Sequence, residues 1–289
     1  MDKPVGFTVT PLSPALGAEI GGLDLRDSLP QQTVDDIIVQ SLEHIVLVFR
    51  NQEIDDEQQL RFAQRFGELG GRKIAPSALR SRVEGVQQNH PAILLVSNIK
   101  LEGEAVGAFG DDDMWYHIDS GYAERPYKYT FLHGVALPSS GGNTLFANMY
   151  AAYEALPAET RDKLAGRKAL HIHQYKRSEA VDISGDFSNS PHHYHPVFVT
   201  HPETGRKSLF VDRLMTARIE GLEPDDSAAT LNELFEHSEK PEFVYEHVWQ
   251  LGDLVIWDNR RSIHGRTYFP ENEERLLRRC TIQGEVPVE

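Results

Sequence analysis

The chain has 289 residues, of which 40% are hydrophobic and 25% are charged, as expected for a globular protein with a sizeable core. Its formal net charge of −15 argues against a general affinity for nucleic acid or acidic membrane surfaces. The single cysteine, Cys280, excludes an intrachain disulfide and a cysteine-rich metal site. The N-terminus lacks the apolar core of a secretory signal, and no stretch approaches about 18 consecutive apolar residues, so we expect a cytoplasmic protein without a membrane span.

The N-terminal part of the chain mixes strand and helix patterns. Val34, Ile37 and Ile38 recur on one helical face, whereas HIVLVFR is the continuous apolar run of a buried strand. The predicted strands are 5–10, 44–50 and 92–99, and the predicted helices are 33–43 and 55–66. Polar, glycine-containing sequence near 100–114 indicates a mobile loop.

Strand patterns dominate the rest of the chain. The predicted strands are 127–137, a hairpin at 195–211, two strands around the turn at 251–253, and a final strand at 275–284. Helices are predicted on either side of Pro157, which interrupts the helical pattern, and at 225–237. Residues 174–193 are polar and aperiodic, which indicates an insertion or a lid.

The order of these elements predicts the fold class. Many short strands occur with a few helices, and the regular strand–helix alternation of a parallel sheet is missing. A mainly β fold with flanking helices and a double-stranded β-helix (jelly roll) core fits this pattern best. No repeat or linker marks a boundary, so residues 1–289 are expected to form a single domain.

The densest chemical signal is WYHIDS at 115–120. Residues two apart on a strand point to the same side, so His117 and Asp119 can bind one ion from one face. His264, which follows an apolar strand and precedes a glycine, is the best third ligand. Such a 2-His-1-carboxylate set leaves positions open for a cosubstrate and oxygen, which suits non-haem iron(II).

Other histidines compete for this role. His171 and His173 share a strand face, and His192, His193 and His195 crowd one segment. We interpret these as surface histidines or as histidines with ordinary hydrogen-bond partners, because the sequence that follows them contains no comparable anion-binding array.

Three arginines follow His264 in an apolar setting. On an extended strand Arg275 and Arg279 point to one side and Arg278 to the other. Arginine binds carboxylates through a fixed fork of donors, so this pair can hold anions. The alternative is a solvated charged strand whose arginines pair with the glutamates at 271, 273 and 274.

With these motifs in view, the chain resembles the TauD/TfdA family of iron(II)/2-oxoglutarate-dependent dioxygenases, which includes taurine dioxygenase and aryloxyacetate dioxygenases. The resembling segments are 46–71, 115–122, 138–157, 195–211, 252–265 and 274–282. They occur in the family's order over nearly the whole chain. The resemblance implies that iron(II) is held by His117, Asp119 and His264, with 2-oxoglutarate and O2 as cosubstrates.

The resemblance also assigns the anion-binding residues. The arginine eleven residues beyond the distal histidine grips the far carboxylate of 2-oxoglutarate in this family, and Arg275 occupies that position. The threonine of the GGxT motif, here Thr144, assists it. A further arginine four residues on faces the acidic group of the substrate, which implies this role for Arg279. Members of the family often form dimers or tetramers, so a homo-oligomer is expected.

Two departures from the family pattern bear on the substrate. Tyr116 separates Trp115 from the HxD motif, where the family usually reads WHxD. Tyr116 either lines an apolar part of the substrate pocket or belongs to the core. Taurine dioxygenase has a histidine and a tyrosine near the equivalents of Arg72 and Ala75, and their absence argues against taurine. Arg72 instead offers positive charge for another anion, or belongs to a solvated loop.

The resulting hypothesis is an oxygenase that hydroxylates a small anionic organic substrate and forms succinate and CO2. Carboxylates, aryloxyalkanoates, sulfonates and sulfate esters are the candidate substrates. Hydroxylation beside an ether oxygen or a sulfur gives a product that fragments, so C–O or C–S cleavage is included. The alternatives are a non-catalytic cupin-like binding protein and a zinc-dependent hydrolase that uses the same three ligands.

Overall fold

The largest element of the protein is an eight-stranded mixed sheet. A computed structural model describes residues 6–71, 90–110, 113–174, 176, 178–183 and 185–289. The strand order in this sheet is β1 (Thr8–Pro11), β2 (Ala18–Gly21), β3 (Val46–Phe49), β17 (Leu254–Asp258), β9 (Tyr127–Ala136), β19 (Leu276–Gln283), β4 (Leu94–Ser97) and β7 (Ala108–Phe109). Only the β2–β3 and β4–β7 pairs are parallel.

A second, antiparallel sheet packs against one face of the first. Its order is β16 (Val244–His247), β10 (Thr144–Asn148), β18 (Ser262–Arg266) and β8 (Met114–His117). Val255 and Trp257 of the large sheet share a buried cluster with Phe146 and Tyr245 of the small one. Since alternate residues of a strand point to one face, this cluster uses every second residue of β17.

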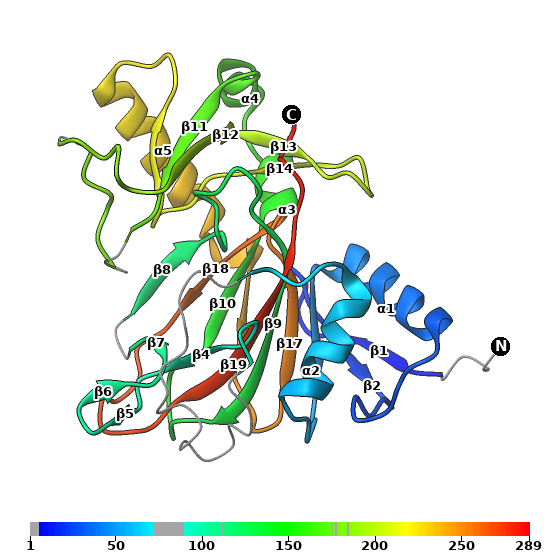
Figure 1. Ribbon diagram of the computed structural model, residues 1–289. Helices are drawn as coiled ribbons and strands as arrows, with labels where there is room; N and C mark the ends of the chain where they lie inside the picture. Colours follow the sequence, from blue (N-terminus) through cyan, green and yellow to red (C-terminus); the bar gives the residue numbers. More distant parts are fainter. Residues whose placement is uncertain (1–5, 72–89, 111–112, 175, 177, 184) are drawn as a thin grey trace.

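Helices cover the other face of the large sheet (Figure 1). These are α1 (Gln31–His44) and α2 (Asp56–Ala63), the latter continued by a 3-10 turn at Gln64–Phe66. Val34 of α1 and Leu60 of α2 pack on Leu47 and Phe49 of β3. Because β3 also contributes to the cluster between the sheets, both of its faces are buried, which explains its continuous apolar sequence.

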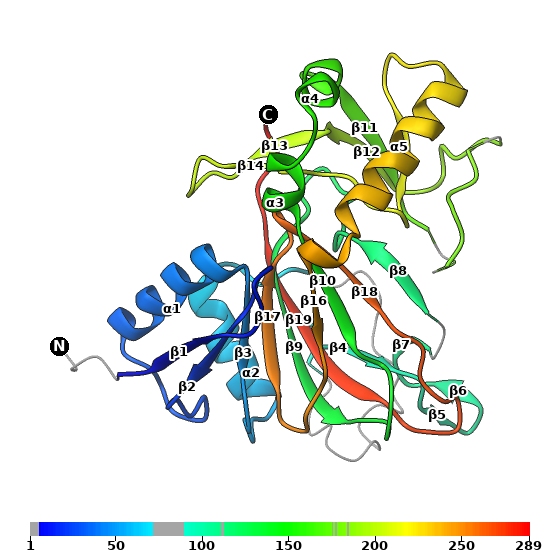
Figure 2. The same ribbon diagram turned by 180° about the vertical axis from the view of Figure 1, so that it is seen from behind.

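The remaining elements lie at one end of the two sheets, where Figures 1 and 2 show them above the strands. They are a three-stranded sheet of β12 (His192–Pro196), β11 (Lys168–Ile172) and β15 (Thr216–Ile219), a hairpin of β13 (Phe198–Thr200) and β14 (Lys207–Leu209), the helices α3 (Met149–Glu154), α4 (Ala158–Leu164) and α5 (Pro224–Ser238), and a 3-10 turn at Pro241–Phe243. They enclose a separate apolar cluster that includes Leu164, Phe210 and Leu231.

The mainly β class and most predicted elements are confirmed, including the helix break near Pro157 and the hairpin within 195–211. The two strands around 251–253 differ from a simple hairpin, because β16 and β17 belong to different sheets. In the segment expected to be a loop near 100–114, the described residues form a short hairpin of β5 (Lys100–Leu101) and β6 (Glu104–Ala105), followed by β7. Residues 111–112 of that segment, and 175, 177 and 184 of the expected lid, lie outside the described residues.

Within the described chain, none of the helices combines the length and the apolar character that crossing a bilayer requires.

A buried ion pair joins α2 to the large sheet. Arg278 donates to Asp56 over 2.9 Å, and both side chains are at least 97% buried. The guanidinium of Arg278 also contacts the Ile54 carbonyl and His133. Arg278 is the arginine that points to the opposite side of β19 from Arg275 and Arg279, and its role is structural.

Replacing Asp56 with alanine is expected to lower the free energy of unfolding by about 3–5 kcal/mol, because it leaves a buried guanidinium without its carboxylate. Urea unfolding followed by circular dichroism measures this change. The matched control is Asp24→Ala, which removes an exposed ion pair with Arg26 and should leave the unfolding midpoint nearly unchanged. Equal effects of the two substitutions would contradict a structural role for the buried pair.

Candidate active site

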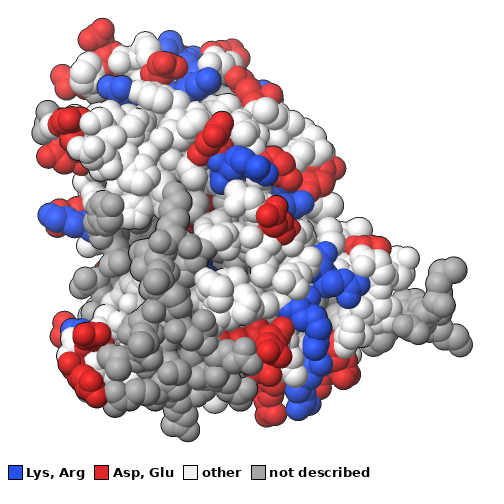
Figure 3. All heavy atoms as spheres, in the orientation of Figure 1, with Lys and Arg blue, Asp and Glu red and all other residues white. Residues whose placement is uncertain are grey.

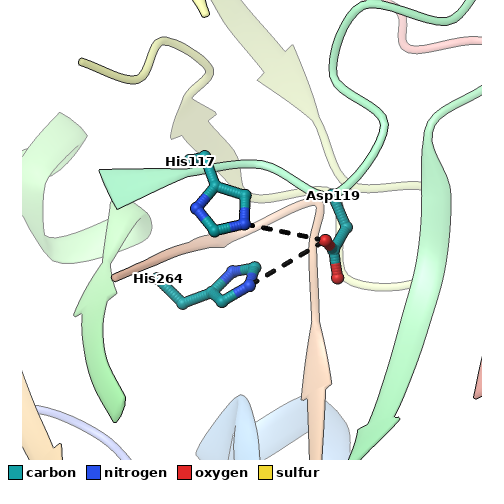
Figure 4. Close-up of side chains that lie close together, drawn as sticks. All are labelled: His117, Asp119 and His264. Atoms are coloured by element: carbon teal, nitrogen blue, oxygen red, sulfur yellow. Dashed lines mark ion pairs between the residues drawn. The ribbon is translucent and has the colours of Figure 1, made fainter. Parts of the chain in front are cut away.

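Two histidines meet where the strands β8 and β18 pair. His117 is the last residue of β8 and lies directly opposite His264 in the antiparallel register. Asp119 follows in the turn after β8 and points its carboxylate at both rings (Figure 4). Its Oδ1 lies 3.8 Å from His117 Nε2 and 3.9 Å from His264 Nε2. The pattern within 115–120 and the distant histidine are thus brought together as predicted.

The donor atoms of these three residues suit a metal ion. One ligand atom from each lies within 4.8 Å of the others, and all three residues are buried. His117 Nδ1 lies 3.0 Å from the Trp115 carbonyl, to which it can only donate, so its Nε2 faces the site with a lone pair. No other group of three such residues is found in the described part of the chain.

The local backbone differs from the regular strand that the sequence argument assumed. β8 ends at His117, and the register against β18 shifts between His264 and Arg266, where two residues of β8, Trp115 and Tyr116, oppose the single Gly265 of β18. This bulge places Met114 and His117, which are three residues apart, on the same cavity. Asp119 reaches the site from a turn.

Tyr116 is not among the residues that line this cavity, so the core alternative fits it. Its side chain packs against the apolar cluster around α3 and α5, and burial raises the pKa of its hydroxyl. The physical reason is the alternation of side chains along β8, which sends the neighbours His117 and Tyr116 to opposite faces. Arg72, the other predicted substrate residue, lies outside the described residues.

Asp119 is held as an anion despite its burial. Burial alone would raise the pKa of its carboxyl, but the charge of Arg279 and the nearby rings of His264 and His117 hold that pKa well below its usual range. Arg279 Nη2 contacts Asp119 Oδ1 at 2.6 Å. Thr130 Oγ1 donates to the other oxygen, Oδ2, at 2.5 Å.

The cavity beside the triad contains the predicted anion-binding residues. Its lining residues are Val96, Phe109, Met114, His117, Asp119, Leu132, Thr144, Trp257, His264, Gly265, Arg266, Arg275 and Arg279. Arg275 and Arg279 therefore face one space, while Arg278 points away from it. The hydroxyl of Thr144 accepts a hydrogen bond from Trp249 Nε1 at 3.0 Å, which fixes its orientation at the cavity wall.

Arg275 is a buried cation without an acidic partner. Its side chain is 2% exposed, and its Nη2 donates only to the Gly142 carbonyl, at 2.9 Å. Gly142 has a φ of +64°, and a Cβ there would lie 2.9 Å from Arg275 Nε, so this turn requires glycine. Among the residues that the structure describes, no carboxylate pairs with Arg275. On the surface shown in Figure 3, by contrast, acidic and basic side chains lie intermingled.

Arg266 is a site residue that the sequence reasoning missed. It lies two residues beyond His264 on β18, so the two-residue period of a strand was the signal that could have found it. Its guanidinium donates to the carbonyls of Phe109 and Gly110, each at 3.0 Å. Burial and then the charge of Arg266 lower the pKa of the neighbouring Arg275 guanidinium.

The charges that line the cavity do not balance. Two guanidiniums, of Arg275 and Arg279, face one carboxylate, of Asp119, and these three described groups leave a formal charge of +1 with the histidines neutral. A divalent metal ion raises this further. Such an excess of buried positive charge favours the entry of anions into the cavity.

Three of the competing histidines, His171, His193 and His195, form a cluster apart from the triad. His195 lies between His171 and His193, with ring centroids 5.5 and 4.7 Å away. His195 Nε2 donates to the Ala123 carbonyl at 2.9 Å, and His171 Nδ1 is 3.7 Å from Asp212. Through the hydrogen bond from His195 to Ala123, the cluster therefore supports the turn that carries Asp119.

Three protein ligands gathered on one side of an ion leave positions open for a cosubstrate and dioxygen, an arrangement that defines the class of non-haem iron(II) oxygenases. The chain belongs to the family described as "Taurine catabolism dioxygenase TauD, TfdA family", whose model matches residues 8–281. It is an oxidoreductase that depends on iron(II), 2-oxoglutarate and O2.

Relatives of known activity agree with this assignment. The alpha-ketoglutarate-dependent 2,4-dichlorophenoxyacetate dioxygenase of Cupriavidus pinatubonensis is 36% identical over 297 residues, which cover 98% of this chain and 100% of that protein. Pentalenolactone F synthase of Streptomyces arenae is 33% identical and covers 93% of each chain. The crystal structure of a putative alpha-ketoglutarate-dependent taurine dioxygenase from Burkholderia xenovorans superposes with a TM-score of 0.81 at 31% identity, over 98% of this chain and 94% of the other.

The histidine cluster predicts a pH dependence of stability. Burial, followed by the nearby His171, lowers the pKa of His195 from 6.5 to about 3. Between these values the unfolded chain binds a proton that the folded chain does not, so stability is fully present above about pH 6.5 and is lost as the pH falls towards 3.

Replacing His195 with glutamine removes this titrating group and should flatten the fall of the unfolding free energy between pH 7 and pH 4, by up to about 1.4 kcal/mol per pH unit. Urea unfolding at several pH values measures the slope. His192→Gln, at an exposed position on the same strand, is the control and should keep the wild-type slope. Parallel slopes for the wild type and His195→Gln would contradict the prediction.

Proposed function

We propose that His117, Asp119 and His264 hold the iron(II) ion. The support is their common cavity, their burial and the convergence of their ligand atoms. Two imidazoles and one carboxylate form a donor set that suits iron(II). When bound, iron(II) activates dioxygen so that 2-oxoglutarate is oxidised to succinate and CO2 and one oxygen atom enters a substrate C–H bond.

We further propose that Arg275 and Thr144 bind the carboxylate of 2-oxoglutarate that is distant from the metal. The single observation that carries the proposal is the buried guanidinium of Arg275, which has no carboxylate partner within the described part of the chain. A fork of N–H donors binds a carboxylate through two parallel hydrogen bonds, and the Thr144 hydroxyl lines the same cavity. Arg266 contributes a second positive charge nearby.

The substrate is proposed to be a small organic carboxylate with an apolar or aromatic body, of the aryloxyalkanoate type. Arg279 supplies the cation for its acidic group, since one guanidinium carries five N–H donors and can serve Asp119 and a ligand together. The apolar walls are Val96, Phe109, Met114, Leu132 and Trp257. A relative that acts on 2,4-dichlorophenoxyacetate supports this class over sulfonates.

The charge of the cavity fits two anions. With iron(II) bound, the formal charge of Arg275, Arg279 and Asp119 together rises from +1 to about +3. A dianionic 2-oxoglutarate and a monoanionic substrate would offset it. An uncharged substrate would leave the buried excess charge uncompensated, so a carboxylate is favoured.

For an aryloxyacetate, hydroxylation of the carbon beside the ether oxygen gives a hemiacetal. The hemiacetal breaks its C–O bond, and the hydroxyl proton ends on the departing phenol. Each turnover then converts one 2-oxoglutarate, one O2 and one substrate into succinate, CO2, a phenol and glyoxylate. The protein residues serve to orient the C–H bond and to exclude water from the cavity.

We also propose that the two main sheets form a double-stranded β-helix within a single domain. The shared apolar cluster between the sheets and the similarity to a taurine dioxygenase structure support this arrangement.

Anaerobic titration with iron(II) and 2-oxoglutarate tests the proposed site. We expect a visible metal-to-ligand charge-transfer band that weakens strongly in His117→Ala, Asp119→Ala and His264→Ala. The band should shift on adding 2,4-dichlorophenoxyacetate but not on adding taurine. Undiminished bands in the ligand variants would reject the metal site, and a shift with taurine alone would reject the proposed substrate class.

Activity assays distinguish the rivals. A zinc-dependent hydrolase would act on its substrate without oxygen or 2-oxoglutarate, and a binding protein would form no succinate in air with any candidate substrate. Neither rival explains why a buried guanidinium should face the metal cavity without a carboxylate.

Replacing each of the two arginines should weaken the binding of a different ligand. Arg275→Leu should weaken 2-oxoglutarate binding by about 2–5 kcal/mol, because it removes one partner of a buried charged contact. Arg279→Ala should weaken substrate binding more than 2-oxoglutarate binding. Dissociation constants from the charge-transfer band measure both effects, and equal losses in both variants would reject the separate roles.

A further inference from the structure

The two oxygens of Asp119 lie in different environments. Oδ1 faces His117 Nε2, His264 Nε2 and Arg279. Oδ2 instead accepts a hydrogen bond from the Thr130 hydroxyl at 2.5 Å. Thr130 is fully buried in the middle of β9, on the large sheet opposite the turn that carries Asp119.

A chain of hydrogen bonds fixes the direction of the Thr130 hydroxyl. Trp257 Nε1 donates to Asn259 Oδ1 at 2.9 Å, and Asn259 Nδ2 donates to Thr130 Oγ1 at 3.0 Å. An indole N–H can only donate, so it determines which end of the Asn259 side chain is the amide nitrogen. That nitrogen occupies a lone pair of the hydroxyl oxygen, and the hydroxyl hydrogen is left to point at Asp119.

The chain of donors is preorganised by the sheet. Trp257 and Thr130 are directly paired across β17 and β9, and Asn259 follows at the end of β17. Thr130, Trp257 and Asn259 are at most 1% exposed, so water does not compete for these bonds. In such surroundings a hydrogen bond to a carboxylate is short and strong.

We propose that Thr130 is a positioning residue that keeps Asp119 a one-oxygen ligand of the metal. This rests on the proposed metal site at His117, Asp119 and His264. A carboxylate that turned both oxygens to the ion would take a further coordination position. With Oδ2 bonded to Thr130, only Oδ1 faces the metal, and the positions that 2-oxoglutarate and dioxygen require stay open.

The test compares Thr130→Val with Thr130→Ser. Valine keeps the volume and shape of threonine but removes the hydroxyl, whereas serine keeps it. The control is Thr281→Val, because Thr281 lies directly opposite Thr130 on β19 and is 7% exposed. Binding of manganese(II) alone is measured from the free-ion electron paramagnetic resonance signal, and urea unfolding without metal is measured alongside.

We expect Thr130→Val to raise the manganese(II) dissociation constant by about tenfold or more, as is typical when a partner of a metal ligand is removed. Thr130→Ser and Thr281→Val should bind nearly as the wild type does. The inference is overturned if Thr130→Val binds as tightly as the wild type, or if Thr130→Ser or Thr281→Val loses as much affinity.

Asp119→Ala separates this outcome from a failure of the metal site itself. If Asp119→Ala binds manganese(II) as the wild type does, the proposed ligand set is wrong. If Asp119→Ala loses binding while Thr130→Val keeps it, the metal site stands and only the role of Thr130 is rejected. The inference is supported if Thr130→Val loses affinity for manganese(II), Thr130→Ser keeps it, and the two variants have similar free energies of unfolding.

Discussion

The antiparallel pairing of β8 with β18 is the constraint on which the site depends. It sets His117 opposite His264, so two proposed ligands separated by about half of the chain share one register position. The bulge in the same pair turns Met114 into the cavity and leads the chain into the turn that carries Asp119. A slip of one residue in this register would move the His117 ring to the opposite face of the sheet.

The apolar scaffold makes the charges of the site effective. The cluster between the two sheets keeps Arg275 and Asp119 out of water, so their interactions are screened little. Some of the buried charge is matched within the protein, as at Arg278 and Asp56. The cavity instead keeps a surplus of guanidiniums, and this surplus distinguishes a ligand site from a structural ion pair.

Support for the metal ligands comes from distant parts of the fold. On the large sheet, Asn259 donates to Thr130, and Thr130 donates to the carboxylate of Asp119. His195 donates to the Ala123 carbonyl just after the turn that carries Asp119. These contacts reach the same turn from two directions.

The sequence by itself determined the candidate triad, the pair Arg275 and Arg279 on one strand face, and most of the strands that carry them, because motif spacing and the two-residue strand period are local properties. Only the tertiary structure decided that Asp119 lies beyond the strand end, that Met114 shares the cavity with His117, and that Thr130 contacts the carboxylate. A bulge breaks the period without leaving a residue signature. A threonine in the middle of a strand is ordinary until the opposing sheet brings a carboxylate to its hydroxyl.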